Sequence, residues 1–194
     1  MDYIDSNMKR ATDDLRNDHK IVKRLRNIAK KCSDHIYAGH DIPFDDIKNI
    51  IVVIEEFIDR CHHSKEECAY FPTTKGNDAA MDEEARALII EHEFGRRIAR
   101  FIDESFGHYR ENKDAREPLA RFLKAHVDFI DAHTTREEKF FDWVDESIKV
   151  SEDVQHNILE KFENIEEEKI GRGKHHELVA SVEDLEKKPW MQSL

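Results

Sequence analysis

The sequence predicts an all-α protein, an antiparallel up-and-down four-helix bundle followed by two short additional C-terminal helices. The chain of 194 residues is 38% charged and holds only 6 glycines and 4 prolines, which suits long helices with few loops. Between breakers, apolar residues recur every three or four positions, the period of an α-helix, and no segment alternates long enough for a strand. Long helices joined by short loops favour the bundle.

Each predicted helix is bounded by a breaker: AGHDIP, FPTTKGND, GHYRENKDAREP or GRG. The four long helices are expected at about 7–37, 44–71, 82–109 and 116–147, and the short pair at 152–168 and 174–187. Ser151 is a good start for the fifth helix, because its hydroxyl can cap the first turn and two acidic residues follow it. We expect a single domain over 1–194, with the bundle at about 7–147 and a helical extension at about 151–187.

The formal net charge of −12 argues against nucleic acid or an anionic membrane as the main partner, because phosphate binding requires a basic patch. The apolar run IIVVI is too short to span a bilayer, and the start MDYIDSNMKR has no apolar segment typical of a signal peptide. The expected location is the cytoplasm.

The three cysteines, Cys32, Cys61 and Cys68, do not suggest a disulfide scaffold, because their number is odd and their spacing unpaired. On a helix, Cys61 and Cys68 would lie about 10 Å apart, too far to bridge. We interpret them as reduced thiols, with a redox role as the alternative.

Two adjacent histidines stand in the stretch HHSKEECAYFP of the second helix. One apolar line on this helix, Ile47 to Ile58, continues by fours to His62 and then Glu66. The next residue, His63, is rotated by about 100° on an α-helix. We therefore expect His62 and Glu66 to point into the bundle, and His63 and Glu67 to lie on its flank.

The other long helices carry histidines on their apolar lines in the same way. His19 lies on the first helix, His92 on the third, and His133 with Glu137 on the fourth. A further pair with this spacing, His156 and Glu160, lies off its apolar line, and we expect it at the surface.

The chain thus contains the order His…His-x-x-x-Glu twice, and in antiparallel hairpins these residues are level with one another. Four histidines and two glutamates would meet inside an apolar core, where a carboxylate is costly unless it is paired or binds a metal. Imidazole and carboxylate without thiolate suit iron, manganese or zinc. Two carboxylates that bridge two metals, each with an open position, fit better than a closed, cysteine-rich structural zinc site. The ferritin-like alternative needs Glu-x-x-His, which is absent.

The sequence resembles the hemerythrin-like family, also called the HHE cation-binding domain. The resemblance rests on NDHKIVKRL, HHSKEECAYFP, IIEHEFGRRI and FIDAHTTREEKFF. It implies a non-haem centre of two iron ions with an oxo or hydroxo bridge. It also implies terminal ligands and bridging carboxylates at these positions: His19, His62, His92 and His133 as terminal ligands, Glu66 and Glu137 as bridges.

The chain departs from the oxygen-carrying hemerythrins, which have two histidines one turn apart on the third helix. Here that second position is Arg96, and the last acid is a glutamate four residues after its histidine. The pattern is closer to bacterial iron-centre repair proteins and to iron- and oxygen-sensing domains. With four imidazoles, we expect both irons to keep an open position, which argues against reversible O2 carriage.

Two histidines stay open to interpretation. His63 is either a ligand, if the second helix is rotated, or a group that supports a ligand, and His126 is expected in the core or hydrogen-bonded behind a ligand. The remaining histidines are expected in solvent: His35, His40, His108, His156, His175 and His176. We expect the last helix to pack through Leu178, Val182 and Leu185.

Three functions remain. The pair of irons could form a binding module for O2, NO or iron that serves as a carrier, sensor or store. It could instead form an enzyme that reduces NO, decomposes peroxide or supplies iron to damaged clusters. The third possibility is a structural metal site. We favour reactivity with O2, NO or peroxide in a stress response, with a small molecule as the partner. Oligomeric state is left open.

Overall fold

The computed structural model describes residues 10–192, and within them every regular element is helical. The elements are α1 (Ala11–Tyr37), α2 (Phe44–Val53), η1 (Ile54–His63), η2 (Glu66–Tyr70), α3 (Phe71–Thr74), α4 (Ala79–Glu111), η3 (Lys113–Ala115), α5 (Arg116–Ser147), α6 (Glu152–Lys169), α7 (Lys174–Glu186) and α8 (Pro189–Gln192). The all-α prediction is confirmed.

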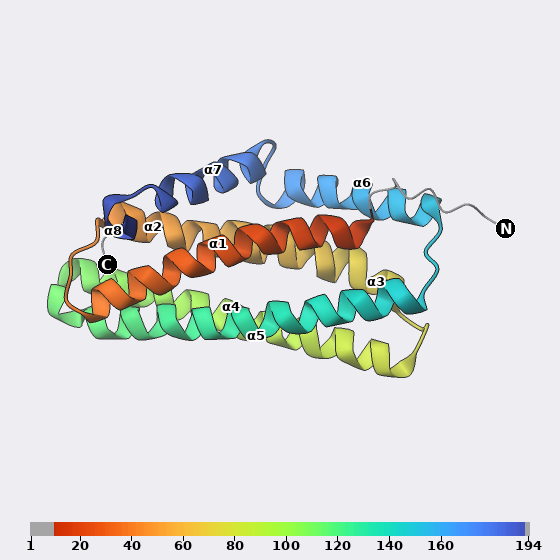
Figure 1. Cartoon of the computed structure of the whole chain (residues 1–194), viewed down its shortest axis with the longest axis horizontal. Coiled ribbons are helices and arrows are strands. Elements are labelled where there is room, and N and C mark those ends of the chain that lie inside the picture. The colour runs from red at the N-terminus through yellow and green to blue at the C-terminus, as the bar shows by residue number, and fades with distance from the viewer. Residues whose placement is uncertain (1–9, 193–194) are drawn as a thin grey trace.

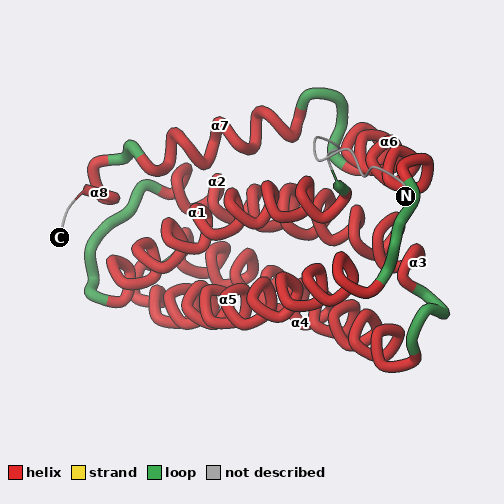
Figure 2. Tube along the Cα trace, turned by 45° about the vertical axis from the view of Figure 1, so that its right-hand side comes forward, coloured by secondary structure: helices red, strands yellow, loops and turns green. Residues whose placement is uncertain are grey.

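The long helices α1, α4 and α5 lie side by side with the nearly continuous helix formed by residues 44–74, which we call the α2–α3 segment (Figures 1 and 2). Helix α5 packs against both α1 and α4. The shorter helices α6 and α7 cover one side, where they contact α1 and the α2–α3 segment. None of the helices in residues 10–192 is long and apolar enough to cross a membrane.

Local capping explains where several helices begin. The Asp78 Oδ1 accepts hydrogen bonds from the backbone N–H groups of Ala80 and Met81, at 2.7 and 3.1 Å, so α4 starts three residues before its predicted position. Ser151 caps α6 as expected. Residues 7–9 of the first predicted helix lie outside the described residues, and α1 follows the N-cap Arg10.

The α2–α3 segment is not a regular α-helix. Residues 54–63 and 66–70 form π-helix, in which each N–H bonds five residues back and a turn contains more residues. The periodicity of the sequence predicted an α-helix throughout, so this widening is a structural finding that the pattern did not indicate. It alters which side chains face the core.

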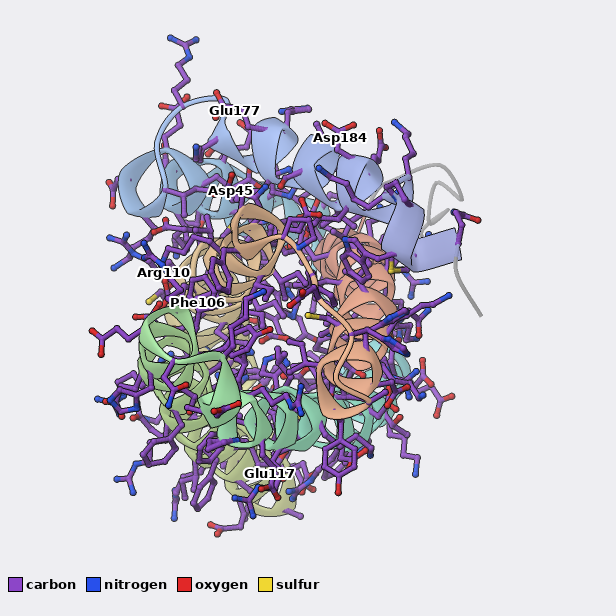
Figure 3. All side chains as sticks on the ribbon, turned by 90° about the vertical axis from the view of Figure 1, so that its left-hand side faces the viewer. Asp45, Phe106, Arg110, Glu117, Glu177 and Asp184 are labelled. Atoms are coloured by element: carbon purple, nitrogen blue, oxygen red, sulfur yellow. The ribbon has the colours of Figure 1, made fainter. Side chains whose placement is uncertain are left out.

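Two apolar clusters fill the interior, one toward each end of the long helices, and buried polar side chains lie between them along the chain. The first cluster includes Leu178, Val182 and Leu185, as predicted. The second includes Ile158 and Phe162 of α6. Charged side chains such as those labelled in Figure 3 lie on the outside.

Two of the histidines expected in solvent are buried or half-buried. His35 is 5% exposed, and its ring centroid lies 6.3 Å from that of Trp190, so this prediction is wrong. His175 is half-buried against α1. Cys32 and Cys61 are buried and Cys68 is exposed; all three thiols are free, and burial raises the pKa of Cys61 to about 12.

Candidate metal centre

The buried polar side chains between the two clusters form two adjacent groups that could each hold a metal ion. The three-histidine group consists of His63, His92 and His133. The mixed group consists of His19, His62, Glu66 and Glu137. Within each group, the potential ligand atoms all lie within 4.8 Å of one another, and every member is buried. All six residues predicted to converge are therefore found together, with one addition.

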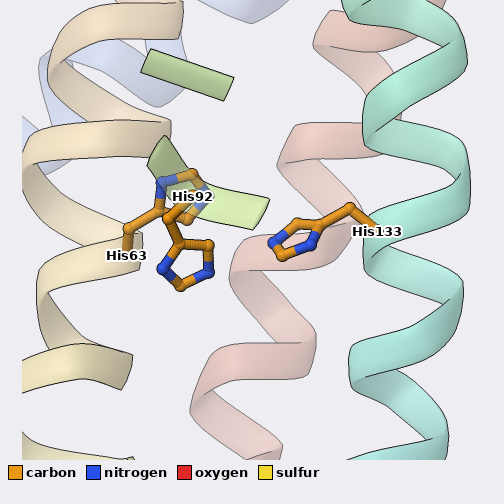
Figure 4. Close-up of side chains that lie close together, drawn as sticks. All are labelled: His63, His92 and His133. Carbon is orange, nitrogen blue, oxygen red and sulfur yellow. The ribbon is translucent and has the colours of Figure 1, made fainter. Parts of the chain in front are cut away.

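The addition is His63, and its predicted position on the flank is wrong. Its side chain is only 2% exposed, and its ring stacks on that of His92 with centroids 3.9 Å apart. Figure 4 shows these two rings beside each other, with His133 reaching toward them from a separate helix. A π-helical turn rotates successive side chains by a smaller angle than an α-helical turn, so His62 and His63 both face inward.

The two carboxylates lie between the groups. One oxygen of Glu137 is 3.0 Å from the Nε2 atom of His133 and 3.1 Å from that of His92, while its other oxygen is 3.2 Å from the Nε2 atom of His19. Likewise, the two oxygens of Glu66 lie 3.4 Å from His92 and 3.6 Å from His62. Each carboxylate thus directs one oxygen to each group, the arrangement required of a bridging ligand.

Several of these atoms have no hydrogen-bond partner among the described residues, although they are buried. They include the Nε2 atoms of His19, His62 and His133, both oxygens of Glu66, and one oxygen of Glu137. Buried polar groups in folded proteins are nearly always paired, so a cluster of unpaired lone-pair donors fits metal coordination. The donor set of imidazoles and carboxylates suits iron, manganese or zinc.

In His19, His62, His92 and His133, the Nδ1 atom faces a carboxylate on a neighbouring helix. The Nδ1–H groups of His19, His92 and His133 donate to Glu138, Glu67 and Glu91 at 2.7 to 2.8 Å. The Nδ1 atom of His62 lies 3.5 Å from Asp18. We call Asp18, Glu67, Glu91 and Glu138 the supporting acids. Because an ionised carboxylate only accepts, it places the hydrogen on Nδ1 and leaves the Nε2 lone pair for a metal.

The supporting acids close a ring around the four long helices. An acid on α1 supports the histidine on the α2–α3 segment, an acid there supports α4, an acid on α4 supports α5, and an acid on α5 supports α1. Each supporting acid directly precedes or follows a member of the two groups in the sequence. Its backbone position is therefore fixed by the same turn of helix.

A cation holds each supporting acid from its outer side. Arg16 binds Glu138, Lys65 binds Asp18, Arg96 binds Glu67 and Arg136 binds Glu91. In every case the cation and the supported histidine belong to the same helical segment, so a neighbour's acid lies between them. Burial acts to raise the pKa of all four acids, but hydrogen bonds from histidines, and after them the contacts with the cations, outweigh burial and lower the pKa of each acid.

His63 is the exception to this ring, since its nearest acid, Asp59, lies one turn earlier in the same segment, 3.5 Å from Nδ1. Arg96 donates to Asp59 at 2.6 Å and to Glu67 at 2.7 Å. The arginine that occupies the position of a fifth histidine therefore holds the acids behind two histidines of the three-histidine group, His63 and His92.

The carboxyl groups of Glu66 and Glu137 have pKa values shifted in opposite directions. Burial and the negative charge of Glu137 raise the pKa of Glu66 well above its usual value. Burial also acts to raise the pKa of Glu137, but His133, His19 and His92 outweigh it and hold this pKa well below its usual value. Burial acts to lower the pKa of His133, yet contact with Glu137 and Glu91 raises it to about 9. Without metal, the imidazoles thus compensate one buried carboxylate far better than the other.

The remaining site predictions concern residues outside the two groups. His126 is 3% exposed, as expected for a core position, and lines a small cavity together with His63 and Gly95. Burial lowers its pKa to about 4. His156 and Glu160 are 76% and 60% exposed, so the prediction that this pair lies at the surface is confirmed.

Comparison with known proteins agrees with this geometry. The hemerythrin HHE cation binding domain matches residues 10–112, more than half of the chain. Three curated relatives are 22% identical over 178 residues, which is 91% of this chain and 69% of each relative. They are the uncharacterized proteins Rv1995 and MT2051 of Mycobacterium tuberculosis and Mb2018 of Mycobacterium bovis. No solved structure matches the chain significantly.

Proposed function

The chain belongs to the hemerythrin HHE cation-binding family, and we propose that its two ligand groups hold a non-haem pair of iron ions that reacts with O2, NO or peroxide. The scaffold that we infer is the antiparallel four-helix bundle, with α6 and α7 added at its C-terminal end. The metal ligands that we propose are His19, His62, His63, His92 and His133, with Glu66 and Glu137 as bridges.

One observation carries the proposal. The two groups share two carboxylates, and each carboxylate has one oxygen beside each group. A single metal ion would leave part of this set without a partner. Two ions would use every unpaired Nε2 and carboxylate oxygen named above.

The groups offer the two ions different numbers of ligand atoms. The three-histidine group offers three imidazoles and one oxygen from each carboxylate, whereas the mixed group offers two imidazoles and the other two oxygens. We infer that a small molecule binds at the ion held by His19 and His62, where more positions remain free.

His63 also changes the argument about oxygen carriage. The expectation that both irons stay open assumed four imidazoles, and the inward position of His63 removes that assumption. Five imidazoles around two ions specifically favour a second candidate function, a binding module that takes up and releases O2 or NO without turnover.

Bound iron supplies the electrons and the open coordination position for either function. The chain supplies three other things. It orients each imidazole through a supporting acid, and it holds the proton on Nδ1. It also keeps bulk water away, because every proposed ligand is at most 2% exposed.

Metal analysis tests the proposed centre directly. The protein reconstituted with ferrous iron should hold two ions per chain, and its thermal unfolding midpoint should rise, because metal that binds only the folded state stabilises it. One zinc ion, or no bound metal after reconstitution, would refute a di-iron centre.

Reaction with O2 separates the two candidate functions. Anaerobically reduced protein is mixed with O2 in a stopped-flow spectrometer and then sparged with argon. If the iron pair is consumed in a reaction with O2, the spectrum of the oxidised protein should persist after sparging. Recovery of the spectrum of the reduced protein would instead support the binding module.

A further inference from the structure

The four cations behind the supporting acids differ in burial. The side chains of Arg16, Arg96 and Arg136 are 23%, 24% and 38% exposed, but that of Lys65 is only 1% exposed. Helix α6 covers this lysine: its Nζ atom lies 2.6 Å from Glu166 and 5.7 Å from the centre of the Phe162 ring. The supporting acid and the cation behind His62 are therefore covered by the C-terminal helices.

Both C-terminal helices reach the same supporting acid. Asp18, 4% exposed, lies 3.3 Å from the Nε2 atom of His175 on α7 and 2.9 Å from Lys65, which binds Glu166 on α6. The side of Asp18 that contacts Lys65 also faces His62 at 3.5 Å. In the described residues, no hydrogen bond or ion pair joins another supporting acid to α6 or α7.

We propose that α6 and α7 are a working part of the metal centre, in which Glu166 and His175 act as positioning residues for the ligand His62 through Lys65 and Asp18. The inference rests on the proposed metal-binding function. Both helices lie beyond residues 10–112, so the family match does not include them. The contacts end at His62 alone, so the influence is directed at the ion of the mixed group.

Electrostatics support this direction of influence. Lys65 faces three carboxylates, Asp14, Asp18 and Glu166. When one of these carboxylates is removed, the ammonium group of Lys65 is expected to move closer to the carboxylates that remain, because an unpaired buried charge is costly. Glu166 thereby controls how tightly Lys65 draws Asp18 away from His62.

Metal titration of point variants tests the proposal. Glu166→Gln and His175→Leu alter half-buried residues, so they disturb folding less than a change at Lys65. Ferrous iron is titrated into metal-free wild type and variants in competition with a chromophoric chelator. Each variant should weaken one of the two ions by up to about tenfold and leave the other unchanged, because each residue acts one or two contacts behind Asp18, and removing a group bonded directly to a histidine ligand costs about 10- to 100-fold.

Matched controls come from the next residue along each helix. Glu167→Gln and His176→Leu make the same chemical changes at exposed positions and should bind both ions as wild type does. His175→Gln distinguishes a hydrogen-bonding role of His175 from a purely structural one. This variant keeps an N–H donor, so it should bind the weakened ion more tightly than His175→Leu does. The cobalt(II)-loaded spectrum should change in Glu166→Gln and not in Glu167→Gln.

The possible outcomes are distinct. If wild type fails to bind two ions, the proposed metal centre is wrong. If wild type binds two ions and Glu166→Gln and His175→Leu bind both with unchanged affinity and spectrum, the role of α6 and α7 is overturned and the centre stands. Equal weakening of both ions, or equal effects of His175→Gln and His175→Leu, would also overturn it.

Discussion

The two halves of the chain carry the same motif on differently wound helices. In the second half, His92 lies on α4 and His133 with Glu137 on α5, and both helices are regular α-helix. In the first half, His19 lies on regular α1, but His62 lies in π-helix and Glu66 starts a second π-helical run. The second half of the chain contributes two imidazoles to the two ligand groups, and the first half contributes three. A motif therefore does not determine a ligand set until the helix that carries it is known.

The halves differ again in their glutamates. Glu137 lies within 3.2 Å of three imidazole nitrogens, whereas Glu66 lies 3.4 Å or more from its nearest imidazole nitrogens. The carboxylate on the π-helical side is thus the less compensated one, in agreement with its raised pKa. The widened helix adds an imidazole to the two groups, but its own carboxylate has the longer contacts with imidazole nitrogens.

The largest expected effect comes from removing a bridging carboxylate. Glu137→Ala and Glu66→Ala should each lower affinity for both ions by more than about 100-fold, since each carboxylate touches both groups and a direct ligand matters more than the groups behind it. Inductively coupled plasma analysis of reconstituted protein measures the loss. Retention of two ions by either variant would mean that the carboxylates do not bridge.

The inward position of His63 is tested by comparing it with His133, its counterpart in the three-histidine group. His63→Ala and His133→Ala should each release one ion per chain preferentially, because each takes one imidazole from the same ion. The contrasting result, with His63→Ala retaining both ions at wild-type affinity, would place His63 on the flank as an α-helix would.

Substitutions of Arg96 and Arg136 should have smaller effects on metal affinity, and the two effects should differ measurably. Arg96 holds the acids behind two histidines, and Arg136 holds the acid behind one. Arg96→Gln should therefore weaken metal binding by about tenfold or more and exceed Arg136→Gln, measured by chelator competition. Equal affinities in the two variants would show that Asp59 does not support His63.

The burial of His126 predicts that the free energy of unfolding depends on pH even without bound metal. Its pKa is about 4 in the folded protein and 6.5 for an ordinary histidine. Between these values the unfolded chain binds the proton and the folded chain does not, so the stability is fully present above pH 6.5 and falls as the pH drops toward 4. From pH 7 to 5 the loss is about 2 kcal/mol.

The measurement is urea unfolding of metal-free protein at pH 7 and pH 5. His126→Leu lacks the titrating group, so its loss of stability over this interval should be smaller than that of wild type by that amount. A parallel decline in both proteins would show that His126 takes up its proton while folded.

We expect no effect on metal binding from changes in the exposed pair His156 and Glu160. His156→Ala and Glu160→Ala should keep both ions and the wild-type unfolding midpoint, because both side chains are solvent-exposed. Loss of metal in either variant would mean that the spacing of the motif matters more than its burial.

The sequence predicted the helices and six of the seven convergent residues, because burial on an α-helix follows directly from apolar spacing. It left open whether His63 faces the centre. Residues 54–63 contain no glycine or proline, so nothing in their sequence marks the change from bonding four residues back to bonding five back. His35 was misjudged for a related reason, since the chain near Trp190 that covers it is distant in sequence.

The supporting acids could have been anticipated. Asp18, Glu67, Glu91 and Glu138 each stand beside a predicted ligand, and this adjacency recurs on all four long helices. The cations are harder to find, because arginines and lysines three or four residues away are common on any charged helix. Only the crossing of the helices shows that each cation reaches an acid of its neighbour.

The π-helix also bears on how such centres diverge. A π-helical turn holds one residue more than the α-helical turn it replaces, so the α2–α3 segment can switch between one and two inward histidines through a single-residue deletion or insertion. In the proposed centre, His63 would thus supply the fifth imidazole, which the residue at position 96 does not. The winding of one helix would set how many imidazoles face the two ions, without a change in the identity of any histidine.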